Sequence, residues 1–583
     1  MRFFKTFLAA LLAFIVFTGL CFIVLLAIIG KAISREPVTV SPNGILTLQT
    51  SQAFSEQKIV NPVAAFLGDE SSEIPGLFQA VRLIQHAATD DNIKGIYLKV
   101  DGNGNGFAGT EELRNAILRF RKSGKFVYAY GEVMTQQAYY LASAADKVCL
   151  NPKGGIDFGG FSTQLTFFKG TLEKLEIQPE IFYCGKFKSA TEPLRESQMT
   201  EANRIQTNQF LGELYGNYLS GIGKARQLDT ATLHGYANGN LIKEATDALK
   251  YKLVDGLKYD DEVMSELKSK TSIKTDEDLN LVPFLKYNSA VTLNNGGGEH
   301  KIAVIYAQGD IISGESDKQN VISSESYIHD IRKAREDKKV KAIVLRVNSG
   351  GGSALASEVI WRELSLAKKV KPVVVSMGDY AASGGYYISC MADTIFAQPN
   401  TLTGSIGVFG IMFNMENFFK NKLGVTFDGV KTAPYADLGT MSRPLNEVEK
   451  RFIQDGVDSI YASFKSRVVA GRKLNAAVVD SIAQGRVWSG TDALRLGLVD
   501  RIGGLNEALN CAARLAKVSE YRMVEYPEIK DKLSRLLKNV GGEVQATMVK
   551  REMGVNYDLY QQLKAIQHIP GDVQAKLPFV YKF

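Results

Sequence analysis

The feature that most constrains the fold of this chain is an internal repeat. Residues 95–160 align with residues 342–407 without a gap when 247 is added to each number. A second match, at an offset of 245, pairs T-D-A-L-K-Y-K-L-V-D (246–255) with T-D-A-L-R-L-G-L-V-D (491–500). Solenoid repeats are only roughly 20–50 residues long, so a period of this length indicates a duplicated domain instead.

Each copy alternates short apolar runs with segments of helical periodicity. The runs G-I-Y-L-K-V (95–100) and A-I-V-L-R-V (342–347) both end in glycine-rich turns. Each is followed by a helical pattern, at 111–120 and 357–367, and then by another apolar run. Strands that alternate with helices of this length predict an α/β fold made of βαβ units with a mostly parallel sheet.

The sequence divides into five predicted segments. They are an N-terminal membrane anchor (1–35), a first repeat (40–288), a linker rich in Gly and Asn (289–300), a second repeat (301–520) and a helical C-terminal tail (521–583). Within the tail, L-S-R-L-L-K-N-V (533–540) and Y-Q-Q-L-K-A-I (560–566) favour helices. The tail has no functional interpretation.

The N-terminus contains 23 consecutive uncharged residues, from Phe7 to Ile29. A helix of this length rises by about 1.5 Å per residue and crosses a hydrocarbon layer of about 30 Å. A cleaved signal peptide has a shorter apolar core, of roughly 7–15 residues, and a small-residue cleavage site. The sequence therefore predicts an uncleaved, single-pass anchor, and the charges on either side leave its orientation open.

Charge and cysteine content exclude several functional classes. The net charge is +7 and no block of five or six like charges occurs, which argues against a nucleic-acid partner. The five cysteines form no C-x-x-C pair and have no regular spacing. We therefore expect no zinc site, no other metal and no cofactor.

One serine of the second copy stands where a nucleophile would be expected. A predicted strand ends near Met377 and leads through A-A to Ser383, which is followed by two glycines and an apolar helical run. A second glycine-rich turn, N-S-G-G-G-S (348–353), ends the preceding strand of the same copy. Backbone N–H groups in such turns can stabilise an oxyanion, although a serine at a helix start can also be a simple cap. The first copy has Gln136 in place of Ser383, so the fold itself does not require the serine.

The base that would activate this serine is not evident from spacing. None of the five histidines lies beside a motif of the repeat, so a Ser-His-Asp triad has no support. A buried lysine can act as the base if its pKa falls toward neutrality. Lys188, in G-K-F-K-S-A-T-E-P (185–193), is one candidate, but a lysine in a turn is more often a solvated charge.

Four motifs together resemble the signal peptide peptidase A (protease IV) family of the long, two-repeat bacterial type. They are L-R-V-N-S-G-G-G-S (345–353), M-G-D-Y-A-A-S-G-G-Y-Y-I (377–388), T-L-T-G-S-I-G-V-F-G (401–410) and G-K-F-K-S-A-T-E-P (185–193). The similarity extends from the anchor to about residue 510. It implies tandem duplicated ββα domains of the crotonase/ClpP-like type, preceded by a transmembrane helix.

The resemblance also implies a serine endopeptidase with a Ser–Lys dyad. Ser383 would be the nucleophile, Lys188 the general base, and Ser405 a hydrogen-bond partner of the lysine amine. The N–H of Gly384 and that of Gly351 or Gly352 would form the oxyanion hole. Each repeat would thus keep one half of a single site.

Further implications of the resemblance concern substrate, assembly and location. The substrates would be cleaved signal peptides and other short apolar peptides. The assembly would be a ring-like homotetramer on the inner membrane of the cell, with its catalytic domains in the periplasm. One departure is Gly350, where the family usually has proline; glycine loses more entropy when the loop is ordered.

Two alternatives remain open at the level of sequence. A crotonase-like acyl-CoA enzyme would use the same oxyanion glycines without a serine nucleophile. A non-catalytic membrane scaffold of the same fold would need neither Ser383 nor Lys188.

Overall fold

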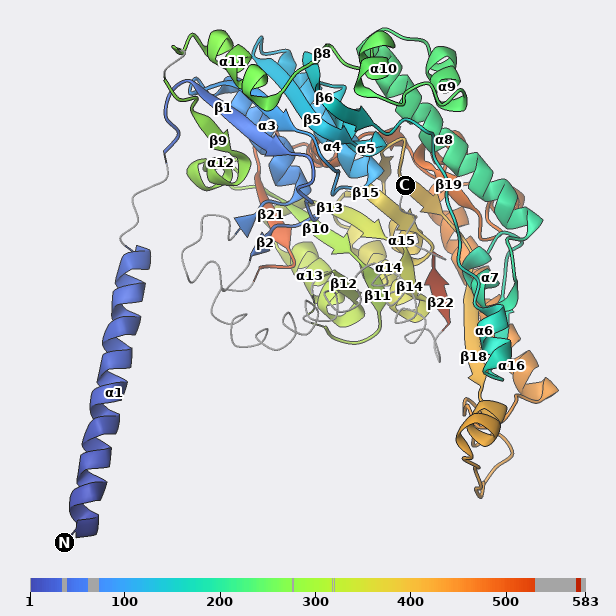
Figure 1. Ribbon diagram of the computed structural model, residues 1–583. Coiled ribbons are helices and arrows are strands. Elements are labelled where there is room, and N and C mark those ends of the chain that lie inside the picture. The colour runs from blue at the N-terminus through green and yellow to red at the C-terminus, as the bar shows by residue number, and fades with distance from the viewer. Residues whose placement is uncertain are drawn as a thin grey trace.

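The computed structural model describes residues 2–33, 39–60, 73–274, 277–316, 318, 320–529 and 573–577. It has two α/β units in succession, each with its own hydrophobic core, and this confirms the predicted tandem α/β architecture (Figure 1).

The first repeat is built on a six-stranded parallel sheet. Its strand order is β8 (Gly256–Leu257), β6 (Lys147–Ile156), β5 (Phe126–Met134), β4 (Ile93–Lys99), β1 (Gly44–Gln49) and β9 (Leu281–Pro283). The short strands β2 (Ile59–Val60) and β3 (Glu73–Ile74) pair separately. Both faces of a parallel sheet need cover, which explains the nearly continuous apolar runs of β4 and β5.

The second repeat has the corresponding sheet. Its path is β19 (Val487–Ser489), β17 (Leu402–Gly404), β15 (Val373–Ala382), β13 (Val340–Ser349), β10 (Lys301–Gln308) and β21 (Arg522–Tyr526). Strand β16 (Thr394–Ala397) pairs with β15 and with β20 (Arg501–Ile502). All these pairs are parallel except β17 with β19.

Helix boundaries follow the repeat predicted from the sequence. In the first repeat the helices are α3 (Leu77–Thr89), α4 (Phe107–Arg121), α5 (Gln136–Ala142), α8 (Glu201–Arg226), α10 (Ala245–Lys250) and α11 (Asp260–Thr271). Their counterparts are α13 (Ser324–Glu336), α14 (Ala354–Lys368), α15 (Gly384–Ser389), α16 (Glu447–Arg472), α18 (Gly490–Arg495) and α19 (Leu505–Leu515). The boundaries of α3 and α4 coincide with those of α13 and α14 after 247 is added.

A few helices remain. They are α6 (Lys169–Lys174), α7 (Glu192–Arg195) and α12 (Phe284–Ala290) of the first repeat. Helices α9 (Thr230–Asn238) and α17 (Ala476–Ile482) are a further pair of counterparts, since α17 begins 246 residues after α9. A 3₁₀ turn covers Ser189–Thr191 and a π-helical turn covers Phe418–Leu423. The predicted linker 289–300 begins within α12 and has no helix or strand from residue 291.

A third sheet joins the two repeats. Its order is β12 (Val321–Ser323), β11 (Asp310–Ile312), β14 (Gly351–Ser353), β22 (Gln574–Lys576), β18 (Phe409–Asn414) and β7 (Gln178–Tyr183). Strand β7 belongs to the first repeat, yet it pairs antiparallel with β18 of the second over six residue pairs. Figure 1 shows the result, with α6 and α7 of the first repeat lying beside β18 and α16.

The described part of the C-terminal tail differs from the helices expected after residue 520. Arg522–Tyr526 forms β21, the edge strand beside β10, and Gln574–Lys576 forms β22. Met523 packs into one buried apolar cluster, and Val524 and Tyr526 pack into another, so the strand contributes apolar side chains to two cores. This packing and the pairing with β10 prevail over helix propensity. The helices expected at 533–540 and 560–566 lie outside the described residues.

The N-terminal segment forms one helix, α1 (Arg2–Ile33). Its window Phe4–Cys21 has a mean hydropathy of 2.1 and is not buried against the rest of the protein. The helix is therefore long and apolar enough to cross a membrane, although a signal sequence would meet the same criteria.

Candidate active site

Ser383 lies at the junction between β15 and α15, as the sequence predicts. Its backbone has φ 53° and ψ −113°, a conformation that is unfavourable for any residue except glycine. The turn aims a serine from the end of a strand into the protein, and its side chain is fully buried. Strain of this kind is characteristic of nucleophiles held at strand-to-helix turns.

Lys188 reaches the same place from the first repeat. It follows β7 and precedes the 3₁₀ turn, so the pairing of β7 with β18 carries it to the second repeat. The loop is held by the Phe187 N–H, which donates to the Gln484 carbonyl at 2.8 Å. Gly485 packs so closely that a Cβ atom there would lie 2.7 Å from the Cβ of Lys188. Only a glycine at 485 leaves space for this approach.

The structure brings three of the predicted residues together. The Lys188 Nζ lies 2.9 Å from the Ser383 Oγ and 3.1 Å from the Ser405 Oγ. Lys188 is 1 % exposed, and both serines are 0 % exposed. Burial lowers the pKa of Lys188 from its ordinary value of 10.5 to about 7. The two hydroxyls carry no charge, so they do not offset this effect of burial on the amine.

Ser405 is positioned by its own strained backbone. It follows Gly404 at the end of β17 and has φ 48°. Its N–H donates to the Arg486 carbonyl at 2.6 Å, while the Ser383 N–H donates to the Gly404 carbonyl at 2.8 Å. The motif T-G-S-I-G therefore links the two serines through the backbone. The ring of Phe409, which begins β18, lies 5.8 Å from the lysine Nζ and covers it with apolar surface.

Two of the three glycines proposed for the oxyanion hole, Gly384 and Gly351, lie next to Ser383. A Cβ atom on Gly384 would lie 3.1 Å from the Cα of Gly351, so these two glycines adjoin. The Gly351 N–H donates to the Ser349 Oγ at 3.1 Å, and an oxyanion there would have to replace that hydroxyl. Gly352 pairs with the C-terminal strand β22. Gly350, where the family usually has proline, has an ordinary negative φ, so the position does not require glycine.

Comparison with known proteins identifies the family. The sequence matches "Peptidase family S49" twice, over residues 119–274 and 365–519, which together cover more than half of the chain.

The chain belongs to peptidase family S49.

Similar proteins carry names that agree with this assignment. "Protease 4" of Salmonella typhi is 39% identical over 486 residues, which span 81% of this chain and 77% of that protein. "Serine protease SPPA, chloroplastic" of Arabidopsis thaliana is 34% identical over 79% of this chain and 69% of that protein. "Putative signal peptide peptidase SppA" of Enterococcus faecium is 37% identical over 40% of this chain and 69% of that protein. The chain is therefore a serine protease of the S49 family, as its motifs indicated.

Two buried polar residues of the S49 site were not predicted from the sequence. Glu192, in the loop that carries Lys188, accepts hydrogen bonds from Thr200 and Asn203. Gln206, on α8, donates to the Phe187 carbonyl and accepts from the Val487 N–H. They anchor the lysine loop to α8 and to β19. Glu192 lies in a quoted motif, so its position was visible, but its partners were not.

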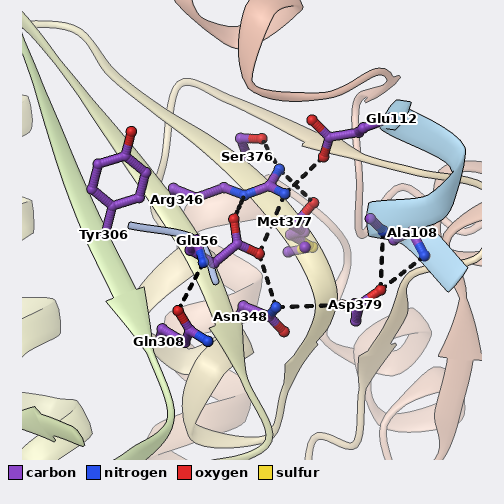
Figure 2. Close-up of polar contacts among 12 residues, drawn as sticks. Glu56, Ala108, Glu112, Tyr306, Gln308, Arg346, Asn348, Ser376, Met377 and Asp379 are labelled. Atoms are coloured by element: carbon purple, nitrogen blue, oxygen red, sulfur yellow. Dashed lines mark hydrogen bonds and ion pairs between the residues drawn. The ribbon is translucent and has the colours of Figure 1, made fainter. Parts of the chain in front are cut away.

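The sequence also did not reveal a buried ion cluster between the two S49 repeats, shown in Figure 2. Arg346, which is 1 % exposed, forms ion pairs with Glu56 and Glu112 of the first repeat, each at 2.7 Å. Burial alone would lower the pKa of Arg346, but Glu112 and Glu56 keep it above the ordinary value. Burial raises the pKa of Glu112, despite this contact with Arg346.

The same cluster reaches both glycine-containing motifs of the second repeat, 345–353 and 377–388 (Figure 2). Asn348, at the start of the glycine turn, donates to Glu56 at 2.8 Å and accepts from the Tyr380 N–H at 3.1 Å. Asp379, four residues before Ser383, accepts hydrogen bonds from the N–H groups of Ala108 and Gly109 at the start of α4. The second repeat therefore caps a helix of the first, where a carboxylate is favoured by the helix dipole.

Replacing Arg346 tests how much the buried ion cluster between the two repeats contributes to the stability of the protein. We expect Arg346→Met to lower the free energy of unfolding by about 3–5 kcal/mol, because Glu56 and Glu112 would remain buried without their partner. Urea unfolding followed by fluorescence of Trp361 and Trp488, both in the second repeat, measures the change. The control is Lys450→Met, which removes an exposed pair with Glu447 and should cost less than about 1 kcal/mol. Equal losses in the two variants would contradict the interpretation.

No group of three or more His, Cys, Asp and Glu side chains within the described residues is arranged to hold a metal ion.

Proposed function

We propose that this chain is a membrane-anchored serine endopeptidase that uses a Ser–Lys dyad. The observation that supports the proposal most strongly is the distance of 2.9 Å between the Lys188 Nζ and the Ser383 Oγ, with both side chains buried. A lysine whose pKa is about 7 is neutral in about half of the molecules at pH 7, and it can then accept a proton.

The proposed mechanism assigns one task to each residue. The neutral amine of Lys188 takes the proton of the Ser383 hydroxyl as the oxygen attacks the peptide carbonyl. The Ser405 hydroxyl holds the amine in the direction of Ser383. N–H groups of Gly384 and of Gly351 or Gly352 stabilise the oxyanion. Lys188 then protonates the leaving amine of the substrate. A water molecule, deprotonated by the neutral Lys188 amine, attacks the acyl-enzyme and releases the acyl group from Ser383.

The proposed substrates are cleaved signal peptides and other short apolar peptides. The name of the Enterococcus relative supports this substrate class. The surroundings of the dyad are also apolar, since Phe409 lies over the lysine amine and Ala382 precedes the nucleophile within a buried apolar cluster.

We further propose an inner-membrane location with α1 as a single-pass anchor and the two repeats in the periplasm, assembled as a homotetramer. The exposed apolar window of α1 supports the anchor. The domain boundaries at 40–288 and 301–520 are proposed as the limits of the two repeats.

Covalent labelling provides the direct test. We expect a serine-reactive peptidyl phosphonate to modify the full-length, detergent-solubilised protein at Ser383 with a stoichiometry near one, and to abolish hydrolysis of a fluorogenic apolar peptide. Peptide mass mapping locates the label. A crotonase-like acyl-CoA enzyme or a scaffold would remain unlabelled, and that result would contradict the proposal.

A further inference from the structure

The central sheet of the second repeat is irregular just before the nucleophile. Strands β13 and β15 pair without interruption as far as Val347 and resume pairing at Ser349. Between these two positions β13 has only Asn348, whereas β15 has the three residues 378–380. A bulge of this kind interrupts the ladder of hydrogen bonds and re-aims the residues that follow it. Those residues are the proposed oxyanion glycines after β13 and Ser383 after β15.

The side chain of Asn348 enters this bulge. Its Oδ1 accepts a hydrogen bond from the Tyr380 N–H at 3.1 Å, and its Nδ2 donates to Glu56 at 2.8 Å. Gly378 leaves room for both groups, since a Cβ atom there would lie 2.6 Å from the Glu56 carboxylate and 3.0 Å from the Asn348 Cγ. Asn348 therefore links the strand that leads to the oxyanion glycines with the strand that leads to Ser383.

The two partners fix the orientation of the amide, because each of them can play only one role. A backbone N–H only donates, and a carboxylate in an ion pair only accepts. Glu56 is 3 % exposed, and its other oxygen accepts from the Arg346 Nε at 2.7 Å (Figure 2). Asparagine offers an acceptor and a donor at this one position, whereas an aspartate of the same shape would offer only acceptors. Glu56 belongs to the first repeat, so the first repeat holds the bulge of the second through one amide.

The copy that lacks the serine has no equivalent amide. Subtracting 247 converts Asn348 into Asp101, just as it converts Ser383 into Gln136. Asp101 is exposed, and the sheet of the first repeat forms without a buried amide at this position. The fold itself therefore does not need the amide, which occurs in the copy that holds the nucleophile.

We propose that Asn348 is a positioning residue for the Ser383 nucleophile and that Glu56 of the first repeat fixes its orientation. This inference rests on the proposed function of the Ser383 site. By holding the Tyr380 N–H, the amide sets where Ser383 emerges from β15 relative to the glycines that follow β13. The attacking oxygen and the oxyanion donors must both be aligned with one substrate carbonyl, so this spacing acts on the chemical step and not on peptide binding.

The isosteric variant Asn348→Asp tests the amide directly. It keeps an acceptor for the Tyr380 N–H but turns a carboxylate oxygen toward Glu56. We expect kcat for a fluorogenic apolar peptide to fall roughly 10- to 100-fold, with KM within about threefold of the parent, because small displacements of reacting groups cost this much. The serine-reactive phosphonate should still label about one Ser383 per chain, only more slowly. The control Asn510→Asp, at an exposed position of α19, should leave both kinetic constants unchanged.

A second substitution moves the charge and should restore the contact. Glu56→Gln supplies an amide that can donate to the new carboxylate at position 348 and accept from Arg346, so the double variant keeps the net charge of the cluster. In the Glu56→Gln background we therefore expect Asn348→Asp to change kcat less than about threefold, against the roughly 10- to 100-fold loss in the parent. This comparison can be made even if the single Asn348→Asp variant does not fold.

Three results would overturn the inference. The first is an unchanged kcat in Asn348→Asp. The second is a smaller number of labelled sites that each react at the parental rate, which would indicate a purely structural role. The third is a loss in the Glu56→Gln background as large as the loss in the parent. If the parent protein is neither labelled at Ser383 nor active, the proposed function itself fails.

Discussion

Ser383→Ala should reduce kcat/KM for a fluorogenic apolar peptide by at least about 10⁴-fold, because it removes the oxygen that forms the acyl-enzyme. Lys188→Met should reduce it by roughly 10³-fold or more, because it removes the amine that contacts the serine hydroxyl. Both side chains act in the same step, so the double variant should be little worse than Ser383→Ala.

The matched control for the lysine is Lys186→Met. Lys186 is exposed and lies two residues earlier in the same loop. Its loss therefore tests whether activity depends on any lysine of this loop or on Lys188 specifically. We expect activity within about twofold of the parent, and circular dichroism should show that all four variants are folded. If Lys188→Met kept the activity of the parent, the dyad would be rejected, whereas a loss in Lys186→Met as well would point to the loop and not the amine.

Activity should rise with pH through the titration of Lys188. The amine is a base only when it is neutral, and its pKa is lowered to about 7 by burial. We therefore expect kcat/KM for a substrate without titrating groups to increase tenfold per pH unit below about pH 7 and to level off above it. A plateau that extends down to pH 5, or a midpoint near 10, would show that Lys188 is not the base.

The same depressed pKa predicts how stability depends on pH. Between about pH 7 and pH 10.5 the unfolded chain binds a proton at Lys188 that the folded protein does not bind. Stability of the parent therefore rises with pH across this range, by about 1.4 kcal/mol for each pH unit at most. Lys188→Met should accordingly be more stable than the parent at pH 7, and the difference should vanish near pH 10.5. Equal stability of the two proteins throughout this range would contradict a buried, neutral lysine.

The prediction from sequence was most accurate where neighbouring residues alone determine structure. Helix and strand patterns arise from side chains two to four residues apart, so the repeat, its strands and the position of Ser383 at the end of β15 could all be predicted. The exchange of Ser383 for Gln136 between the copies indicated which residues the fold does not need.

The prediction was least accurate in the C-terminal tail. Arg522–Tyr526 and Gln574–Lys576 are too short for a clear period, and they became strands because open sheet edges were available to pair with them. Which edge a short strand joins depends on the complete sheet and not on its own residues.

By itself, the sequence determined that this protein consists of two similar α/β units behind an apolar N-terminal helix, and that only the second unit has a serine at the position expected of a nucleophile. The tertiary structure alone decided which amine meets that serine. Lys188 lies 195 positions away in the chain, and it arrives because β7 crosses to pair with β18. The same is true of Arg346 and Glu56, which are separated by 290 positions. No local period relates such residues; they meet only when the sheets assemble, and their burial then sets the charge of the lysine.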